Sequence, residues 1–289
     1  MAMAFTHLRT FHAVADTGGF TSAAAVLGIG QPTVTTQVKE MEHHYGVELF
    51  LRRGRKVELT DTGEALLPIT RRLVGIMEEA DELLTSHGDF RIGNLKLAAV
   101  GPFHATEMIA AFKRAYPAVQ LNVLLGNSWQ TLSNLIDLRA DVAILAHIVD
   151  DERVETIPYS THEVVVFVNR SHPWFGRKKI RLEELARQPF VLRERGSTTR
   201  LAFENAIAEA DILIDPVLEI GSREGVWKAV EQGIGISVVA DFEFVAHPNL
   251  HAIGIEDVRI NTEYRIAHLK ERRHSPKIRA FIDALKLDA

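Results

Sequence analysis

The stretch FTSAAAVLGIGQPTVTTQVKEMEHHYGVELFLRR, residues 20–53, decides the fold of the N-terminal part of the chain. Its alanine-rich start ends in the sequence GIG at residues 28–30, where glycine permits a tight turn. Pro32 then falls in the first turn of the next helix, where its missing N–H costs nothing. Four cations follow within residues 52–56. Two short helices, a glycine turn and a cationic hairpin together predict a helix-turn-helix with a wing.

The helix after this turn has two different faces. Its apolar side chains share one face at helical spacing: Val34, Val38, Met41 and Tyr45. The opposite side carries short polar groups and Lys39. An ordinary surface helix would show the same pattern, but the neighbouring turn and cations favour a helix that enters the major groove of DNA. The cations of the wing would then contact backbone phosphates.

The next segment, residues 60–87, predicts a long helix. Apolar residues repeat there at alternating steps of three and four: Leu66, Ile69, Leu73, Ile76, Ala80 and Leu83. This seam is typical of a coiled coil, so we expect the helix to pair with the same helix of a second copy. A helix packed only on its own domain is the alternative.

Composition narrows the class of protein. The chain has 289 residues, 46% of them hydrophobic, which suits two or three domains with real cores. Cysteine is absent, which excludes disulfides, thiolate metal sites and a cysteine nucleophile. No apolar run is long enough to span a bilayer and no secretory signal is evident, so we expect a cytoplasmic protein without a membrane partner. The net charge of −5 means that any DNA contact relies on a local basic patch.

After residue 90 the pattern changes to strands that alternate with helices. Strands are expected at residues 95–100, 120–125, 141–146, 164–169, 189–193, 217–220 and 236–240, and helices at 106–115, 129–138, 201–210, 223–232 and 276–285. This rhythm predicts an α/β domain with parallel sheets whose faces are covered. Its length fits two lobes, with crossovers near residues 160 and 265, and the last helix would return to the first lobe.

Four segments follow predicted strands and lead into helices, which is where ligands bind in open α/β sheets. Helix N-termini at these positions offer N–H groups to anions. The candidate ligand-binding residues are Gly101, Pro102, Phe103, Asn127, Ser128, Arg195, Ser197, Thr198, Thr199, Ser222 and Arg223. Ordinary helix capping and solvated arginines are the alternative. The hydroxyls and arginines favour an effector with at least one anionic group.

The sequence carries no recognisable catalytic or metal-binding pattern. His43 and His44 point about 100° apart on a helix and do not easily share an ion. The thirteen histidines are therefore interpreted as surface residues. The sequence GIGIS at residues 233–237 precedes its strand, so it is not a dinucleotide fingerprint. We expect no enzyme, no catalytic residue, no cofactor and no metal.

At this point the sequence resembles the LysR-type transcriptional regulators, essentially end to end. The matching residues are Phe20, Ala23, Ala24, Leu27, Gln31, Pro32, Val34, Gln37, Glu42, Gly46, Leu49, Phe50, Arg52, Leu59, Thr60 and Gly63. The resemblance implies an N-terminal winged helix-turn-helix, a linker helix that pairs, and a two-lobed effector domain like the periplasmic binding proteins. It also implies a homotetramer that binds a double-stranded DNA operator and a small-molecule effector, with RNA polymerase as a further candidate partner.

By carry-over from the family, the DNA-binding residues would be Gln31, Pro32, Thr33, Thr35, Thr36 and Lys39 in the groove and Arg52, Arg53 and Arg55 at phosphates. Two departures bear on base preference. Gly30 stands where the family often has a serine able to cap the helix, and Thr36 stands where arginine is common.

The expected domains are the DNA-binding domain at 1–60, the linker helix at 61–90 and the effector domain at 91–289, with lobe I at about 91–161 and 268–289 and lobe II at about 162–267. Segments such as GNSWQTL and EIGSREGV also look similar to LysR-type regulators associated with aminoethylphosphonate catabolism. A phosphonate is therefore the first effector to consider. The alternative is a small-molecule binding module for another ligand, an amino acid or an aromatic acid.

Overall fold

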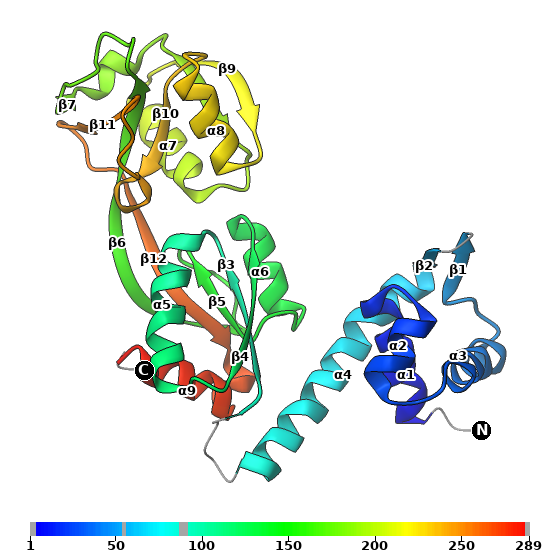
Figure 1. Ribbon diagram of the computed structural model, residues 1–289. Helices are drawn as coiled ribbons and strands as arrows, with labels where there is room; N and C mark the ends of the chain where they lie inside the picture. Colours follow the sequence, from blue (N-terminus) through cyan, green and yellow to red (C-terminus); the bar gives the residue numbers. More distant parts are fainter. Residues whose placement is uncertain (1–3, 54–55, 87–91, 287–289) are drawn as a thin grey trace. The chain divides into compact units, whose positions relative to one another are not determined.

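The computed structural model describes residues 4–53, 56–86 and 92–286. The chain divides into two compact units, Met1–Asp89 and Phe90–Ala289, which are described separately below as the N-terminal and C-terminal units (Figure 1).

The N-terminal unit is a helical domain with a small hairpin. Its elements are α1 (Phe5–Thr17), α2 (Phe20–Leu27), α3 (Gln31–Tyr45), β1 (Phe50–Arg53), β2 (Lys56–Leu59) and α4 (Asp61–Ser86). Gly28 ends α2 in the left-handed region with φ 66°, which a side chain would disfavour. Phe11 of α1 packs on Phe50 of the hairpin with ring centroids 5.2 Å apart, so the hairpin is joined to the helical core.

The long helix α4 begins where the wing ends. The Thr60 hydroxyl accepts a hydrogen bond from the Gly63 amide at 3.0 Å and donates one to the Glu48 carbonyl at 2.7 Å, which fixes the start of α4 against the wing. Leu66, Leu67 and Leu73 pack against the core of the unit. Of the other seam residues, Ile69 and Ile76 are 61% and 59% exposed and Ala80 is also exposed, while the Leu83 side chain lies outside the described atoms. The seam is therefore only partly covered within one chain.

The C-terminal unit has two lobes joined by two strands. Lobe I contains β3 (Asn94–Ala99), α5 (Pro102–Ala115), β4 (Gln120–Leu125), α6 (Ser128–Ile136), β5 (Val142–Leu145), η3 (Lys270–Arg272) and α9 (Pro276–Ala284). Lobe II contains β7 (Lys179–Ile180), η1 (Leu182–Leu185), β8 (Pro189–Arg193), α7 (Thr198–Glu209), β9 (Asp215–Ile220), α8 (Arg223–Glu231), β10 (Ser237–Ala240), η2 (Asp241–Glu243) and β11 (Leu250–Ile255). The joining strands are β6 (Val154–Asn169) and β12 (Asn261–Leu269).

The largest sheet of the C-terminal unit is mixed, whereas the sequence predicted parallel sheets; the separate pair β8 and β9 is parallel, as predicted. Within the described residues, an eight-stranded sheet has the order β4-β3-β5-β12-β6-β11-β7, with β10 also pairing with β6. β3, β4 and β5 are parallel, but β12 runs antiparallel to both β5 and β6. β6 is a single strand of 16 residues, of which the sequence predicted only the last six. The predicted crossovers near residues 160 and 265 are the middles of β6 and β12.

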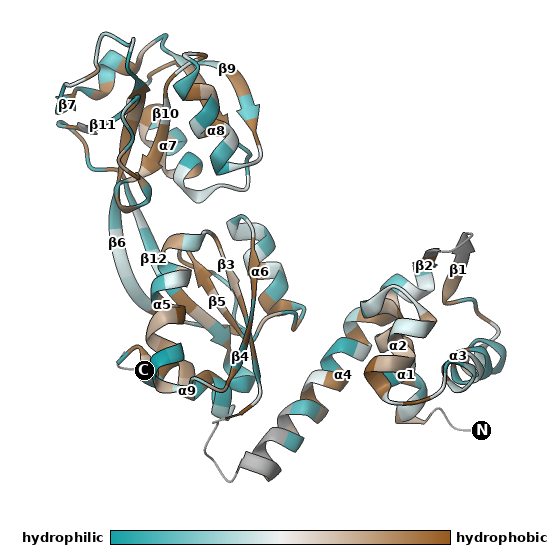
Figure 2. Cartoon of the chain, in the orientation of Figure 1, coloured by the Kyte–Doolittle hydropathy of each residue, from teal (hydrophilic) through white to brown (hydrophobic). Residues whose placement is uncertain are grey.

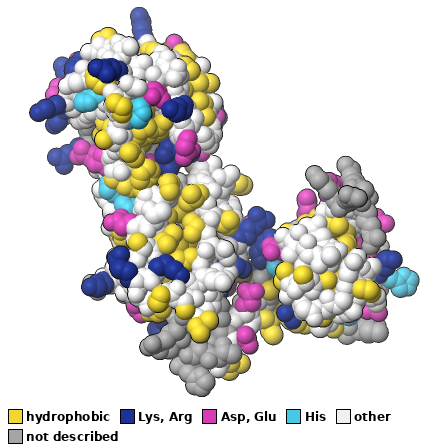
Figure 3. Space-filling view, viewed as in Figure 1, with side chains coloured by type: hydrophobic (Ala, Val, Ile, Leu, Met, Phe, Trp, Pro, Cys, Tyr) yellow, Lys and Arg dark blue, Asp and Glu magenta, His cyan; other side chains and the backbone are white. Residues whose placement is uncertain are grey.

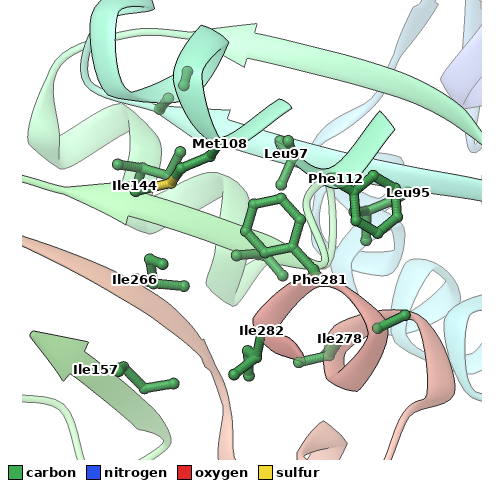
Figure 4. Packing of buried hydrophobic residues seen from close by; sticks show 14 of the residues in the cluster. Leu95, Leu97, Met108, Phe112, Ile144, Ile157, Ile266, Ile278, Phe281 and Ile282 are labelled. Carbon is green, nitrogen blue, oxygen red and sulfur yellow. The ribbon is translucent and has the colours of Figure 1, made fainter. Parts of the chain in front are cut away.

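Each lobe has its own core. In lobe I, Phe281 of α9 packs against Phe112 of α5 with ring centroids 5.5 Å apart, and β3 and β5 supply Leu97 and Ile144 (Figure 4). The last helix therefore returns to the first lobe, as predicted. β6 gives Ile157 to the lobe I core and other residues to lobe II. Between the two cores, β6 and β12 carry mostly hydrophilic residues (Figure 2).

Candidate functional site

The predicted groove-facing residues lie together on α3. Its buried face consists of Val34, Val38 and Met41, whereas Tyr45 is 51% exposed and was wrongly assigned to that face. The opposite side carries Gln31, Pro32, Thr33, Thr36 and Lys39, all exposed, with Thr35 half-buried. Gly30 is the N-cap and makes no side-chain hydrogen bond to the first turn. The helix therefore begins without a side-chain cap and presents short polar groups to solvent.

The wing is held close to α3. β1 and β2 pair antiparallel with Phe50 opposite Leu59, and Glu42 of α3 accepts hydrogen bonds from the amides of Leu49 at 2.8 Å and Phe50 at 3.3 Å. The predicted phosphate contacts Arg52 and Arg53 lie on β1, with side chains outside the described atoms, and Arg55 lies outside the described residues. On the face that Figure 3 shows, the described surface of this unit is mostly uncharged. The wing arginines stay the predicted source of cations beside Lys39 of α3.

In the C-terminal unit the predicted segments meet across the two lobes. The Ser128 hydroxyl of α6 lies 3.0 Å from the Thr198 hydroxyl of α7. Gly101, the N-cap of α5, faces the guanidinium of Arg223, because a Cβ on Gly101 would lie 2.8 Å from Nη1. A side chain on residue 196 would likewise collide with Asn127. Residues from both lobes thus converge on one cleft.

A pocket of about 310 Å³ opens beside this cleft. Pro102 and Phe103 line it from lobe I, and Arg223, Trp227 and Leu250 line it from lobe II. The Arg223 guanidinium lies 5.9 Å from the centre of the Phe103 ring, a cation–π contact across the two lobes. Figure 3 shows hydrophobic side chains gathered on the C-terminal unit where its lobes meet. Arg223 and Lys228 are the arginine and lysine side chains that line this largely apolar space, and only Arg223 contacts Phe103 of lobe I through its guanidinium.

A second space lies on the other side of Arg223. Its volume of about 20 Å³ suits a single water molecule. Ser197 and Thr199, both predicted, line it together with Arg193 and Glu243. Arg195, also predicted, is exposed and lines neither of the two pockets.

Helix capping accounts for several of the predicted polar residues. Asn127 and Gln130 form a reciprocal capping box at the start of α6, with both hydrogen bonds at 3.0 Å. Ser197 caps α7, and Ser222 caps α8 by accepting from the Gly225 amide at 3.0 Å. By contrast, α5 begins at Gly101 without a side-chain cap. Of these four helix starts, α5 alone leaves its first turn uncapped by a side chain, and it faces Arg223.

Sequence reasoning missed the acid that holds Arg223. Nη2 of Arg223 donates to Oε1 of Glu243 at 2.9 Å, and the Tyr264 hydroxyl donates to the same oxygen at 3.2 Å. Glu243 is 2% exposed, and its burial raises the pKa of the carboxyl against the opposing effect of Arg223. Burial also raises the pKa of the Tyr264 hydroxyl. No motif marks Glu243, which lies 20 residues after Arg223 in the chain.

A histidine pair joins the lobes at the middle of β6. Nε2 of His104 on α5 lies 3.0 Å from Nε2 of His162, and Nδ1 of His162 lies 2.9 Å from Oδ1 of Asp241. The Phe242 ring stacks on His104 with centroids 4.1 Å apart. Burial lowers the pKa of His104, which is 8% exposed, so the prediction of surface histidines is wrong here. Among the described residues, no group of three or more His, Asp or Glu is placed to hold a metal ion.

The fold and these surfaces define a class: a DNA-binding winged helix joined to a two-lobed ligand-binding domain. Residues 5–64 match the bacterial regulatory helix-turn-helix proteins of the lysR family, and residues 87–288 match the LysR substrate binding domain. The chain belongs to this family and is a LysR-type DNA-binding transcriptional regulator with an effector-binding domain. In the described residues, no helix is both long and apolar enough to cross a membrane.

Named relatives agree with this assignment. The chain is 30% identical over 280 residues to the HTH-type transcriptional activator CmpR of Synechocystis sp., covering 95% of this chain and 92% of CmpR. Full-length CbnR complexed with its target DNA matches with a TM-score of 0.72 and 21% identity, covering 98% of this chain and 99% of CbnR. The regulatory domain of Synechocystis CcmR in complex with 2-PG matches at 26% identity and a TM-score of 0.61, covering 67% of this chain and 95% of that domain.

Proposed function

We propose that this regulator binds a small anionic effector in the cleft between lobes I and II, with 2-aminoethylphosphonate or a related phosphonate as the first candidate. The observation that carries the proposal is the start of α5, which lacks a side-chain cap and faces the guanidinium of Arg223. A helix N-terminus attracts negative charge, and arginine binds carboxylate and phosphate groups through paired N–H donors. Both features point at the same cleft.

The amine of such an effector also has a candidate partner. Glu224 lines the 310 Å³ pocket and is exposed. Two other acids of lobe II already have partners: Glu194 pairs with Arg193, and Glu219 with Arg200. Of the other charged residues that line the pocket, Lys228 pairs with Glu231 at 2.7 Å. An ammonium group would therefore lie near Glu224 and an acidic group near Arg223. The 2-PG complex of the CcmR regulatory domain supports a small-molecule ligand for a domain of this fold.

Operator binding would use α3 and the wing, and assembly would use α4. The exposed polar side of α3 and its uncapped start suit base edges and a phosphate. The exposed seam residues Ile69 and Ile76 support pairing of α4 with a second copy, and the family supports a tetramer. Size-exclusion chromatography with light scattering distinguishes monomer, dimer and tetramer. A monomer at micromolar concentration would contradict the pairing helix.

Thermal unfolding against a panel of ligands tests the effector. The panel contains 2-aminoethylphosphonate, other phosphonates, amino acids, dicarboxylates and aromatic acids. A ligand at a hundred times its dissociation constant stabilises the folded protein by about 2.7 kcal/mol. The double variant Ser197→Ala with Thr198→Ala is expected to lose the ligand response and keep DNA binding. A response that survives in this variant places the ligand elsewhere.

A second candidate ligand class follows from the apolar lining of the pocket. Phe103, Trp227 and Leu250 would suit the ring of an aromatic acid whose carboxylate reaches Arg223. A shift in unfolding temperature with aromatic acids and none with phosphonates would favour this alternative.

A further inference from the structure

We infer that Glu243 is an internal anion that holds Arg223 in the effector-free protein, and that the effector's acidic group displaces it, so that effector binding is coupled to proton uptake by Glu243. This inference rests on the proposed anionic effector. It assigns to a residue outside the predicted cleft the role of positioning the cleft's cation and of setting the pH dependence of ligand binding.

The geometry places one guanidinium between two anion positions. Arg223 begins α8 and donates through Nη2 to Glu243 at 2.9 Å, while the same guanidinium packs against the Gly101 backbone and lies over Phe103. The Arg223 side chain is 18% exposed, whereas that of Glu243 is 3% exposed. A ligand can therefore reach the arginine but not the glutamate. An anion at the start of α5 would compete with Glu243 for the same cation.

Displacement would leave a buried carboxylate without its ion-pair partner. An ionised carboxylate in such a place is costly, and the usual response is protonation. The charged and titratable groups around Glu243 come from four elements: Arg223 of α8, Arg193 of β8, Tyr264 of β12 and Asp241 of η2. Arg193 already binds Glu194 through two hydrogen bonds of 2.8 and 3.0 Å. Tyr264 supplies one hydrogen bond only, so a proton is the natural replacement for the lost charge.

The same exchange reaches the strands that join the lobes. Tyr264 lies on β12 at the point where its register with β6 shifts. Its hydroxyl bonds to Glu243, and its ring packs against Phe242 with centroids 5.0 Å apart. A protonated Glu243 can donate a hydrogen bond, which the ionised form cannot. Effector arrival would therefore change the hydrogen bonding of β12 as well as that of the cleft.

Isothermal titration calorimetry of the full chain tests the coupling. Two probes are used, 2-aminoethylphosphonate and inorganic sulfate; sulfate keeps its charge between pH 6 and pH 8.5, so any proton taken up goes to the protein. Each is titrated at one pH into two buffers of different ionisation enthalpy. We expect net proton uptake of up to one per site, and a dissociation constant that rises up to about tenfold per pH unit within the titration range of Glu243.

Variants assign the proton. Glu243→Gln is expected to remove the uptake and the pH dependence and to bind sulfate several-fold more tightly, because Arg223 no longer has a charged competitor. Glu209→Gln, an exposed acid on α7, is the matched control and should behave as the parent. If Glu243→Gln does not fold, Tyr264→Phe replaces it, and the pH range of proton uptake should move upward because the ionised carboxyl loses its last donor.

The outcomes separate the two proposals. Binding of either probe without proton uptake, or uptake unchanged by the Glu243 and Tyr264 variants, would overturn the coupling and leave the anionic effector standing. Absence of binding by both probes would overturn the anionic effector and the coupling together.

Discussion

Helices α3 and α5 begin in the same way and face different surroundings. Each has a glycine N-cap in an extended conformation, Gly30 or Gly101, with no side-chain cap and a proline in the first turn. In front of α5 stands the guanidinium of Arg223, whereas the exposed start of α3 presents Gln31 and Thr33 to solvent. Both helices thus begin without a side-chain cap. The start of α5 lies beside Arg223, whereas the cations near α3 are expected to come from the wing.

The largest expected effect is on the free energy of unfolding when Arg223 is replaced. Arg223→Ala should lower the free energy of unfolding at pH 8 by about 3–5 kcal/mol, because Glu243 stays buried without its partner. Since burial raises the pKa of Glu243, lowering the pH lets the carboxyl take a proton and should recover part of the loss. Urea denaturation at several pH values measures it. In a Glu243→Gln background the same change should cost much less, and an equal cost would show that charge is not the cause.

The next effect concerns the histidine pair at the start of α5, His104 and His162. The pKa of His104 lies below its ordinary value of 6.5 because the ring is buried. Below pH 6.5 the unfolded chain takes up the proton before the folded chain does, so the free energy of unfolding falls as the pH falls. Each unit of pKa difference corresponds to about 1.4 kcal/mol. His104→Gln should flatten this dependence, while His251→Gln, a histidine of lobe II, should not.

A smaller effect is expected on the salt dependence of DNA binding, which should involve Arg52 of the wing and not Arg223 of the cleft. Arg52→Ala should weaken binding to all DNA sequences similarly and flatten the slope of log affinity against log salt by about 0.9, one phosphate contact. Fluorescence anisotropy with an operator and a random duplex measures both slopes. Arg223→Lys, which keeps the charge in the cleft, is the control and should leave the slope unchanged. An unchanged slope in Arg52→Ala would remove that arginine from the phosphate contacts.

The smallest effect is expected when the glycine N-caps of α3 and α5 are replaced by serine. A side chain on Gly30 would lie 3.6 Å from Pro32 and 3.9 Å from Thr33, which is ordinary contact. Gly30→Ser should therefore add a cap and stabilise the N-terminal unit by a few tenths of a kcal/mol, about the usual difference between serine and glycine at this position. Gly101→Ser should instead push on Arg223, whose Nη1 would lie 2.8 Å from the new Cβ, and reduce the ligand response. Thermal unfolding with and without ligand measures the stability and the ligand response of each variant. If the two variants show the same stability change and the same ligand response, the predicted difference between the two helix starts is wrong.

The fold of the N-terminal unit could be predicted from the sequence because glycine turns and helical periodicity depend only on residues close together in the chain. The same rules placed Gly101, Ser128, Thr198 and Arg223 at helix starts, where the structure also has them, while their role in ligand binding stays a prediction. They did not find the pairing of Glu243 with Arg223 and Tyr264, which joins three elements distant in the chain. They also missed most of β6, whose middle carries only exposed and half-buried side chains between one core and the other.

The strands β6 and β12 also bear on the order in which the two lobes can fold during synthesis. Lobe I is built from two stretches of chain, and its core needs Phe281 and Ile278 from α9 near the end of the sequence. Lobe II lies between those stretches and has its own core. Because domains emerge from the ribosome in order, lobe II can fold while lobe I still waits for its last helix. A nascent chain can therefore complete the lobe I core, and with it the space between the two lobes, only after α9 has emerged.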